Sequence, residues 1–441
     1  MITTAKTLLM SGFVCLGICQ SALGQTNVQT ESQTASADAT KAAELMTGWL
    51  DVYDVPLAIK DSTITSDKMD LSVVLVRKNG VFEAQKSVFR KIGGDASNES
   101  YSTNFGLNSA VAVVGANATA KLDNCGIRTE TMGANGIFVN AEGANAQINT
   151  LTMMTMLNGS SGLVAGSNGV ITAKEVNVTT MGAYSAALSA KSATITLKGG
   201  VLKTYGIGSP GIFSSGKVVV EDLIVSSLGS VCAVIDGNHS IELKNTVLNN
   251  GAKKAVLLYQ SDDVADLSGT SNFLMIGGSL DAQSGTMFYT TNTQYDVMLS
   301  GVNILNSSKS TLLLKAATDK WGNKTNNGAQ GVVRLKEQDV EGNVDCDKMS
   351  SCSLILTDNS NWTGAINEKK TAKNAAVNLD ATSTWTLTAA CYVQEFTNAK
   401  ADLSNIVSNG NILFYDAKNP KNAWLEGKTL PLNGGGSAKP F

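Results

Sequence analysis

The chain has 441 residues and a formal net charge of −3 at pH 7, and only 16% of its residues are charged. These charges are scattered, so the chain lacks the basic face that nucleic-acid binding requires, and nucleic acid is excluded as a partner. Hydrophobic residues make up 43% of the chain, which leaves ample material for a large core beneath a polar, weakly charged surface.

The N-terminal segment 1–24 has the pattern of a secretory signal peptide. Lys6 is its only charged residue, an apolar run follows it, and the small residues Ala22 and Gly24 predict cleavage before Gln25. The run is shorter than the ~20 apolar residues that a membrane span requires. No later segment is apolar for longer. We therefore expect a mature chain without a transmembrane segment, secreted or held at the cell surface, with the periplasm as the alternative location.

Residues 25–48 are expected to form a flexible lead followed by an N-terminal cap. Residues 25–38 are rich in Thr, Ser and Gln, a composition typical of disorder. The segment from Ala39 to Tyr53 carries Ala42, Leu45 and Met46, and could form one or two helical turns over the end of a repeat stack. Such a cap is expected because an open end exposes unpaired strand edges. A first irregular strand is the alternative.

Five glycines recur at nearly even steps in the middle of the chain: 159−133 = 26, 182−159 = 23, 206−182 = 24 and 229−206 = 23. Similar phrases precede four of them, as in Thr180-Met-Gly182 and Thr204-Tyr-Gly206. A fixed period of this size indicates a repeat architecture. Glycine suits the corners of such repeats because a tight corner often needs a positive φ. The predicted corners are Gly133, Gly159, Gly182, Gly206 and Gly229.

Aligning the repeats on these glycines gives columns of similar residues. The column eleven residues before each glycine is apolar and contains Leu122, Ile148, Ile171, Ile195 and Val218. Neighbouring columns lie two residues apart, which is the period of a strand and not of a helix. The column two residues before the glycine holds Thr131, Thr180, Thr204 and Ser227, with Leu157 in the remaining repeat, and predicts a ladder of hydroxyl groups.

These columns predict an all-β, single-stranded parallel β-helix with coils of about 23 residues. Each coil stacks ~4.8 Å from the next. A sandwich with hairpin turns is the alternative, but it rarely keeps a fixed period. The period loosens after His239 and returns at Trp362 and Trp385, whose spacing is 385−362 = 23. The β-helix is expected over residues 49–430, followed by a flexible tail over 431–441.

Five cysteines remain after removal of the signal peptide. Cys346 and Cys352 lie close together in the sequence and predict a local disulfide in an oxidising compartment. Cys125 and Cys232 are expected to fill the core as small apolar side chains. Because the chain has no Cys-x-x-Cys pair and a single histidine, His239, no metal site is predicted. No cofactor site is predicted either.

The phrases Gly133-Ala-Asn-Gly-Ile-Phe138 and Met287-Phe-Tyr-Thr-Thr-Asn292 resemble those of bacterial pectin-lyase-like proteins. This family is a right-handed parallel β-helix and is often described as adhesin-like. The phrases around Trp362 and Trp385 are similar to the end of autotransporter passenger domains. The chain after Trp362 lacks the long run of amphipathic strands that an outer-membrane barrel needs. Anchoring by its own barrel is therefore not expected.

Enzymes of this fold that cut polysaccharides use clustered carboxylates with a basic residue. The candidates for such a cluster are Asp262, Asp263, Asp345, Asp347, Arg334 and Lys336. The Asp pair and the Arg-Leu-Lys phrase are similar to parts of the polygalacturonase signature. However, His239 precedes the Asp pair here, whereas the histidine follows it in that family, and the Asn-Thr-Asp phrase is missing. No residue is therefore assigned a catalytic role, and His239 is expected in a surface turn.

The leading hypothesis is an exported, non-enzymatic β-helix that acts at or outside the cell surface. Its long side would serve adhesion or glycan binding, with glycans or host and cell-surface proteins as partners. One alternative is a polysaccharide lyase or glycoside hydrolase that acts on acidic polysaccharide through residues 236–350. The other alternative is a structural protein of the cell envelope without a ligand.

Overall fold

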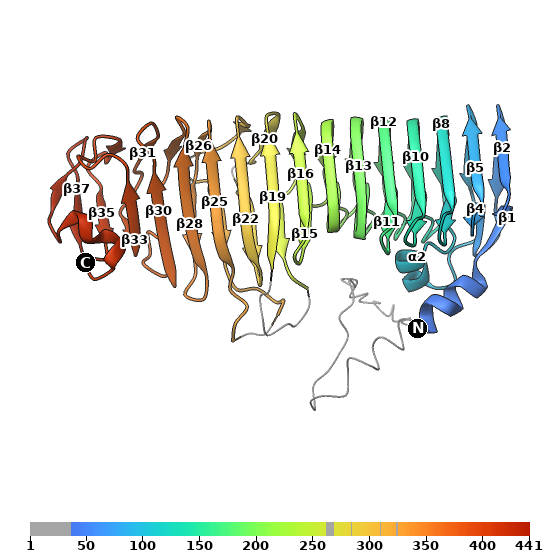
Figure 1. Ribbon diagram of the computed structural model, residues 1–441, viewed down its shortest axis with the longest axis horizontal. Helices are drawn as coiled ribbons and strands as arrows, with labels where there is room; N and C mark the ends of the chain where they lie inside the picture. The colour runs from blue at the N-terminus through green and yellow to red at the C-terminus, as the bar shows by residue number, and fades with distance from the viewer. Residues whose placement is uncertain (1–36, 262–268, 284, 309, 323–324) are drawn as a thin grey trace, which may run out of the picture.

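The computed structural model describes residues 37–261, 269–283, 285–308, 310–322 and 325–441. They form a right-handed parallel β-solenoid of about 15 turns, drawn as one long stack in Figure 1. The predicted all-β parallel β-helix is therefore confirmed. The expected signal peptide over residues 1–24, and the lead up to residue 36, lie outside the described residues, as do Asp262 and Asp263.

Each coil has three faces, and most strands lie on a single face each. The first face contains β1 (Thr47–Tyr53), β4 (Leu71–Arg77), β7 (Val111–Val114), β9 (Ile137–Asn140), β11 (Leu163–Gly166), β15 (Ala233–Asp236), β18 (Lys254–Tyr259), β21 (Thr286–Thr291), β24 (Leu312–Ala316) and β27 (Asn343–Cys346). The second contains β2 (Pro56–Lys60), β5 (Val81–Gln85), β16 (Ser240–Lys244), β19 (Thr270–Ile276), β22 (Gln294–Ser300), β25 (Gln330–Lys336), β28 (Ser351–Thr357), β30 (Asn374–Leu379) and β33 (Glu395–Asn398).

The third face begins with one series of short strands and continues with a separate sheet. The series is β3 (Thr63–Ser66), β6 (Val88–Lys91), β17 (Val247–Asn250), β20 (Ser279–Asp281) and β23 (Asn303–Leu305). The separate sheet is β26 (Asp339–Glu341), β29 (Asn361–Thr363), β31 (Thr384–Thr386) and β34 (Ile406–Val407). Longer strands turn corners and serve more than one face: β8 (Thr119–Thr129), β10 (Asn145–Thr155), β12 (Val170–Thr180), β13 (Leu188–Thr204) and β14 (Ile212–Ser227).

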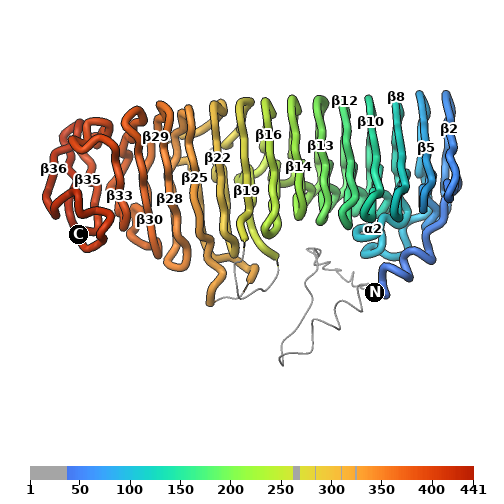
Figure 2. Tube along the Cα trace, in the orientation of Figure 1, coloured from blue at the N-terminus to red at the C-terminus, as the bar shows by residue number. Residues whose placement is uncertain are grey.

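A smaller sheet and a short helix end the stack. The sheet is β32 (Cys391–Val393), β35 (Ile412–Tyr415), β37 (Ser437–Pro440) and β36 (Leu430–Pro431). The short helix is η1 (Pro420–Leu425). Residues 431–441, expected as a flexible tail, thus include a strand that pairs with β35. The coils follow one another along a single long axis from end to end, as Figure 2 shows.

Strand pairing fixes the length of one coil. Asn145 of β10 pairs with Thr119 of the coil before and with Val170 of the coil after, so the steps between these coils are 145−119 = 26 and 170−145 = 25. The next two coils are shorter, since Val170 pairs with Thr194 and Thr194 with Lys217, which gives steps of 194−170 = 24 and 217−194 = 23. Coils with long loops are longer, as in 272−240 = 32 and 330−294 = 36. The mean of about 25 agrees roughly with the predicted 23.

The five predicted glycines occupy two positions of the coil. Gly133 and Gly159 stand in the same turn position, with φ of 66° and 67°, and Tyr184 continues that position with φ of 54°. Gly182 and Gly206 lie two residues earlier in the coil, as does Gly229, and none of these three has a positive φ. A Cβ at Gly206 would collide with the carbonyl oxygen of Gly182 one coil below. The expected positive φ is therefore wrong for three of the five, which are glycine because stacked turns approach closely.

The same two-residue offset affects the apolar column. Ile148 pairs with Leu122 and with Ala173, whereas Ile171 pairs with Ile195. The predicted column therefore joins two neighbouring inward columns of the core. A shift of two residues leaves a side chain on the same face of a strand. For that reason all members of the predicted column are buried.

Buried hydroxyl groups form ladders along the stack. The hydroxyl column contains Thr129, Thr155, Thr180, Thr204 and Ser227, all fully buried and paired in register. A second ladder lies at the following turn. There the Oγ of Ser185 accepts a hydrogen bond from the N–H of Ser160 at 3.0 Å, and the Oγ of Ser209 accepts one from Ser185 at 2.9 Å. Each serine thus satisfies a buried N–H of the coil before it.

One member of the predicted hydroxyl column belongs to another position. Thr129, and not Thr131, is the residue of its coil that pairs with Thr155. Thr131 lies two residues further along the coil, where its hydroxyl donates to Asp95 at 2.5 Å. The cause is again the alignment on glycine, which shifts the first two coils by two residues.

The N-terminal helix lies against the side of the stack. Residues 37–45 are helical, and Met46 packs with Leu75, Leu107 and Ala112 in a small cluster on the outer face of β4 and β7. A second helix, α2 (Glu99–Phe105), lies next to it, and Tyr101 Oη donates a hydrogen bond to Asp38. Figure 1 shows both helices below the strands and β1 and β2 outermost at that end.

Candidate binding site

A groove of about 810 Å³ runs across the outer face of the first coils, over β2, β5, β8, β10 and β12. Strand alternation puts Leu122 and Ile148 into the core and the residues between them outside. The polar side chains that line the groove are Lys60, Glu83, Gln85, Lys121, Asp123, Gln147, Asn149, Thr172 and Lys174. They come from five successive coils, so the groove runs along the long axis of the molecule.

Hydrogen bonds between coils hold the groove side chains in place. Asp123 accepts a hydrogen bond from Asn149 Nδ2 at 2.7 Å and one from Gln85 Nε2 at 3.3 Å. One column away, Lys121 Nζ lies 2.8 Å from Glu83 Oε1. This ion pair is half exposed and adds little stability. The groove therefore presents carboxylate, amide and ammonium groups in fixed rows, which is the chemistry that binds hydroxyl-rich ligands.

The corner beside the groove is made by residues with a positive φ. Asn124, Thr150 and Glu175 occupy equivalent positions in successive coils, with φ of 51°, 56° and 50°. Each follows an outward residue and precedes an inward one, which interrupts the alternation along the strand. The sequence signal for this corner is a pair of polar residues between two apolar ones, such as Asn149-Thr150 before Leu151.

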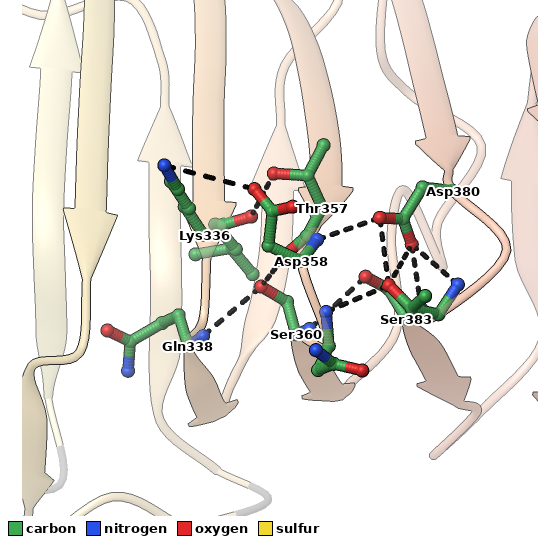
Figure 3. Close-up of polar contacts among 10 residues, drawn as sticks. Lys336, Gln338, Thr357, Asp358, Ser360, Asp380 and Ser383 are labelled. Carbon is green, nitrogen blue, oxygen red and sulfur yellow. Dashed lines mark hydrogen bonds and ion pairs between the residues drawn. The ribbon is translucent and has the colours of Figure 1, made fainter.

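A second, acidic groove of about 640 Å³ lies on the third face, over β23, β26 and β29. Its carboxylates are Glu337, Asp339 and Glu341, and Asn361 Nδ2 donates to Asp339 at 2.7 Å. A ladder of polar contacts borders it, as Figure 3 shows. There Ser360 Oγ accepts from the N–H of Gln338 at 3.2 Å, and Asp380 accepts from the N–H of Asp358 at 2.7 Å.

The residues considered for catalysis have structural partners. Arg334 in β25 donates to both carboxylate oxygens of Asp296, at 3.0 and 3.1 Å. Asp347 accepts from the N–H of Thr318 at 2.7 Å and of Met349 at 3.0 Å. Burial opposes ionisation of Asp347, but these hydrogen bonds outweigh it and hold its pKa below the usual value.

The remaining candidates are spread over different faces and turns. Lys336 Nζ lies 4.0 Å from Asp358 on the second face. Asp345 belongs to the first face, where it pairs in register with Lys315. The backbone of His239 bonds to Gly237 and Asn272 in a turn, and burial lowers the pKa of its imidazole. His239 follows a bend at residues 237–238 and is half-buried. The candidates therefore form no single cluster among the residues that the structure describes.

An aromatic cluster on the first face was not anticipated from the sequence. Tyr289 Oη donates to Asp319 at 2.7 Å, and the ammonium of Lys254 lies 3.4 Å from the centre of the Tyr289 ring. Burial and the carboxylate of Asp319 raise the pKa of Tyr289. Tyr259 packs on Trp321 with ring centres 4.6 Å apart. The loop after β24 brings Asp319 and Trp321 to these tyrosines.

Cys346 and Cys352 stand at the two ends of one turn, between β27 and β28. Both are buried free thiols. The hydrogen bond to Cys352, together with burial, raises the pKa of the Cys346 thiol. The disulfide between Cys346 and Cys352 stays a prediction. Cys125 and Cys232 lie in the core as expected.

No family model matches this sequence. A search of curated proteins also finds no match. In the described part of the chain, no helix is both long and apolar enough to cross a membrane. Among the same residues, no group of three or more His, Cys, Asp or Glu side chains is arranged to hold a metal ion.

The groove residues could not be found from the sequence. Glu83, Lys121 and Gln147 meet in space although each comes from a different coil. Each is an ordinary polar residue at an outward strand position. The available signal was the alternation itself, which marks these positions as outward but does not mark them as a site.

Proposed function

We propose that the protein is an exported, non-enzymatic binding module that holds glycan chains along its outer face, at or beyond the cell surface. The groove across the first coils supports this proposal most directly. It offers rows of amide, carboxylate and ammonium groups from five coils. Hydroxyl groups of a sugar can donate to Asp123 and accept from Gln147, Asn149 and Lys121.

The repeat explains why such binding would use many weak contacts. Neighbouring coils are ~4.8 Å apart, so outward polar groups recur at short, regular steps along the groove, although their chemistry changes from coil to coil. A linear polymer lying along the axis can contact several coils at once, and each further contact raises the overall affinity. The rigid backbone lowers the entropic cost because the groups are already in position.

The binding proposal can be tested with paired variants. The chain from Gln25 to Phe441 is screened on a glycan array, and the best ligand is titrated by calorimetry. The double substitution Gln147→Ala and Asn149→Ala removes two exposed groove amides, and we expect at least a tenfold loss of affinity. The matched control is Asn249→Ala, which removes an exposed coil-to-coil hydrogen bond to Ser226 outside the groove. The control should bind normally.

Three results would count against this function. An equal loss of glycan affinity in Asn249→Ala would show that the groove is not the binding site. Binding to no glycan at all would favour a structural envelope protein. Turnover of an acidic polysaccharide that is lost on Asp345→Asn or Asp262→Ala would favour the lyase or hydrolase alternative.

A further inference from the structure

Within the described part of the chain, the first coil of the solenoid has an open edge. β1, β2 and β3 pair with β4, β5 and β6 on one side. On their other side, no strand pairs with them anywhere in the described residues. The helix over residues 37–45 does not cover this edge, because Met46 anchors it to the outer face of β4 and β7. A strand edge without a partner is a template for another strand.

The open edge also exposes part of the core. Leu50, Leu57, Ile59 and Ile64 point inward but are only partly buried. Their partners one coil further are Val74, Phe82, Ala84 and Phe89, which are almost completely buried. Two apolar residues around the first coil are more exposed still, since Trp49 is 58% accessible and Val55 51%. Tyr53 is 48% accessible, but its ring lies against Arg77 and Lys78 of the next coil. The end of the stack therefore combines unpaired backbone with apolar surface.

The opposite end of the solenoid is closed by side chains. The N–H of Phe396 in β33 donates to Asn422 Oδ1 at 2.8 Å, and Asn422 Nδ2 donates to the carbonyl of Gln394 at 3.0 Å. Trp424 Nε1 donates to the carbonyl of Phe396 at 3.0 Å, and its ring packs on the Phe396 ring. Helix η1 thus takes the place of a further strand beside β33. In head-to-tail stacking, the open first coil of one copy would face this closed end of the next copy and would find no free strand edge there.

We propose that the first coil is the interface of an end-to-end dimer in which two copies meet through β1, β2 and β3. A two-fold axis across this end brings identical edges together in antiparallel orientation, and the interface is self-complementary and closed. The partly buried leucines and isoleucines of each copy then cover those of the other. The closed C-terminal ends point outward, which stops growth into a filament.

The lead of the same chain is a poorer occupant of this edge. Residues 25–36 contain two apolar residues, Val28 and Ala35, among ten polar ones. A strand that covers an exposed core needs an apolar residue at every second position. The second copy supplies this pattern because its own first coil carries it.

The dimer is tested by light scattering after size-exclusion chromatography and by small-angle X-ray scattering on the chain from Gln25 to Phe441. We expect twice the protomer mass, a maximum dimension nearly twice that of one solenoid, and an unchanged cross-section. Leu57→Lys places a charge in the interface and should weaken the dimer at least 100-fold. The double substitution Val55→Lys and Trp49→Lys adds two charges to the first coil and should also weaken the dimer. Because both side chains are exposed in the monomer, folding should not be affected.

The control is Ile207→Lys, which changes an apolar residue that is 73% exposed on the side of the stack. It should leave the dimer intact. A monomer at every concentration would overturn the proposal. A dimer with a doubled cross-section that Ile207→Lys dissociates would show side-by-side association instead. A monomer that dimerises only after deletion of residues 25–36 would show that the lead covers the edge.

Discussion

At the residue scale, Lys91 is the unusual member of the buried hydroxyl column. It pairs in register with Thr129, and its side chain is fully buried. Its ammonium donates to the carbonyl of Lys68. Burial lowers the pKa of Lys91 to about 8, while the nearby carboxylates of Asp70, Asp67 and Asp95 oppose this shift. A charged amine in this position disfavours folding, because the unfolded chain solvates it better.

Lys91 makes stability rise with pH between about 8 and 10.5. In that window the unfolded chain keeps the proton that the folded chain has lost, so the free energy of unfolding increases. The shift of 10.5−8 = 2.5 units corresponds to a rise on the order of 3 kcal/mol. Lys91→Met should remove this rise, as measured by urea unfolding at several pH values. The exposed control Lys203→Met should keep it, and a rise that persists in Lys91→Met would contradict this role.

At the element scale, the close stacking of turns limits the choice of residue. The turns at Gly182, Gly206 and Gly229 pass directly over one another, so that a Cβ on one meets the backbone below it. The strands between these turns pair continuously with both neighbouring coils. A turn that is pushed away therefore disturbs the pairing on both sides.

Gly206→Ala should destabilise the protein by at least about 2 kcal/mol, because the collision is with backbone and cannot relax by rotation of a side chain. Gly410→Ala is the control. Gly410 has φ of 79° and no atom near its added Cβ, so only the unfavourable φ remains, at roughly 1 kcal/mol. Urea unfolding measures both values. Equal losses of unfolding free energy in the two variants would contradict this, because steric crowding at Gly206 would then add nothing to the cost.

The parts of the fold that depend on alternation were predictable from the sequence. Ile171, Ile195 and Val218 are inward because their apolar character repeats with the coil, and Trp362 pairs with Trp385 as their spacing indicated. The coil length was harder to predict, because glycine is required at two positions of the coil for two different reasons. An alignment on glycine alone therefore joins Gly159 with Gly182, although Gly159 is equivalent to Tyr184.

The grooves and the open end were beyond sequence reasoning for a different physical reason. Asp123 and Asn149 become a site only when coils stack, and their polar character alone is ordinary for an outward position. The segment from Ala39 to Tyr53 was expected to form helical turns over the end of the stack. The observed helix over 37–45 lies elsewhere, because Met46 packs against Leu75 and Leu107 on the side of the stack. Pattern predicts which face of an element is apolar, but not which neighbour will cover it.

At the scale of the whole molecule, the repeat produces a rigid body with two unlike ends and a polar groove along its side. The core is continuous from the first coils to the last, which ties the ends together mechanically. Binding along the groove uses the outer face of the first coils, whereas pairing uses the end of the stack, and the two surfaces meet at β2. Two copies joined at their N-terminal ends would present two grooves near the centre of one long particle, which would raise avidity for long polymers.

Chemical footprinting of lysines in the presence of bound glycan tests the binding account most directly. Lys60, Lys121 and Lys174 line the groove, whereas Lys203 is exposed on the third face. The protein is acetylated briefly with and without the glycan selected on the array, and each lysine is quantified by mass spectrometry. We expect bound glycan to lower labelling of Lys60, Lys121 and Lys174 and to leave labelling of Lys203 unchanged. Unchanged labelling of the three groove lysines at saturating glycan would contradict it.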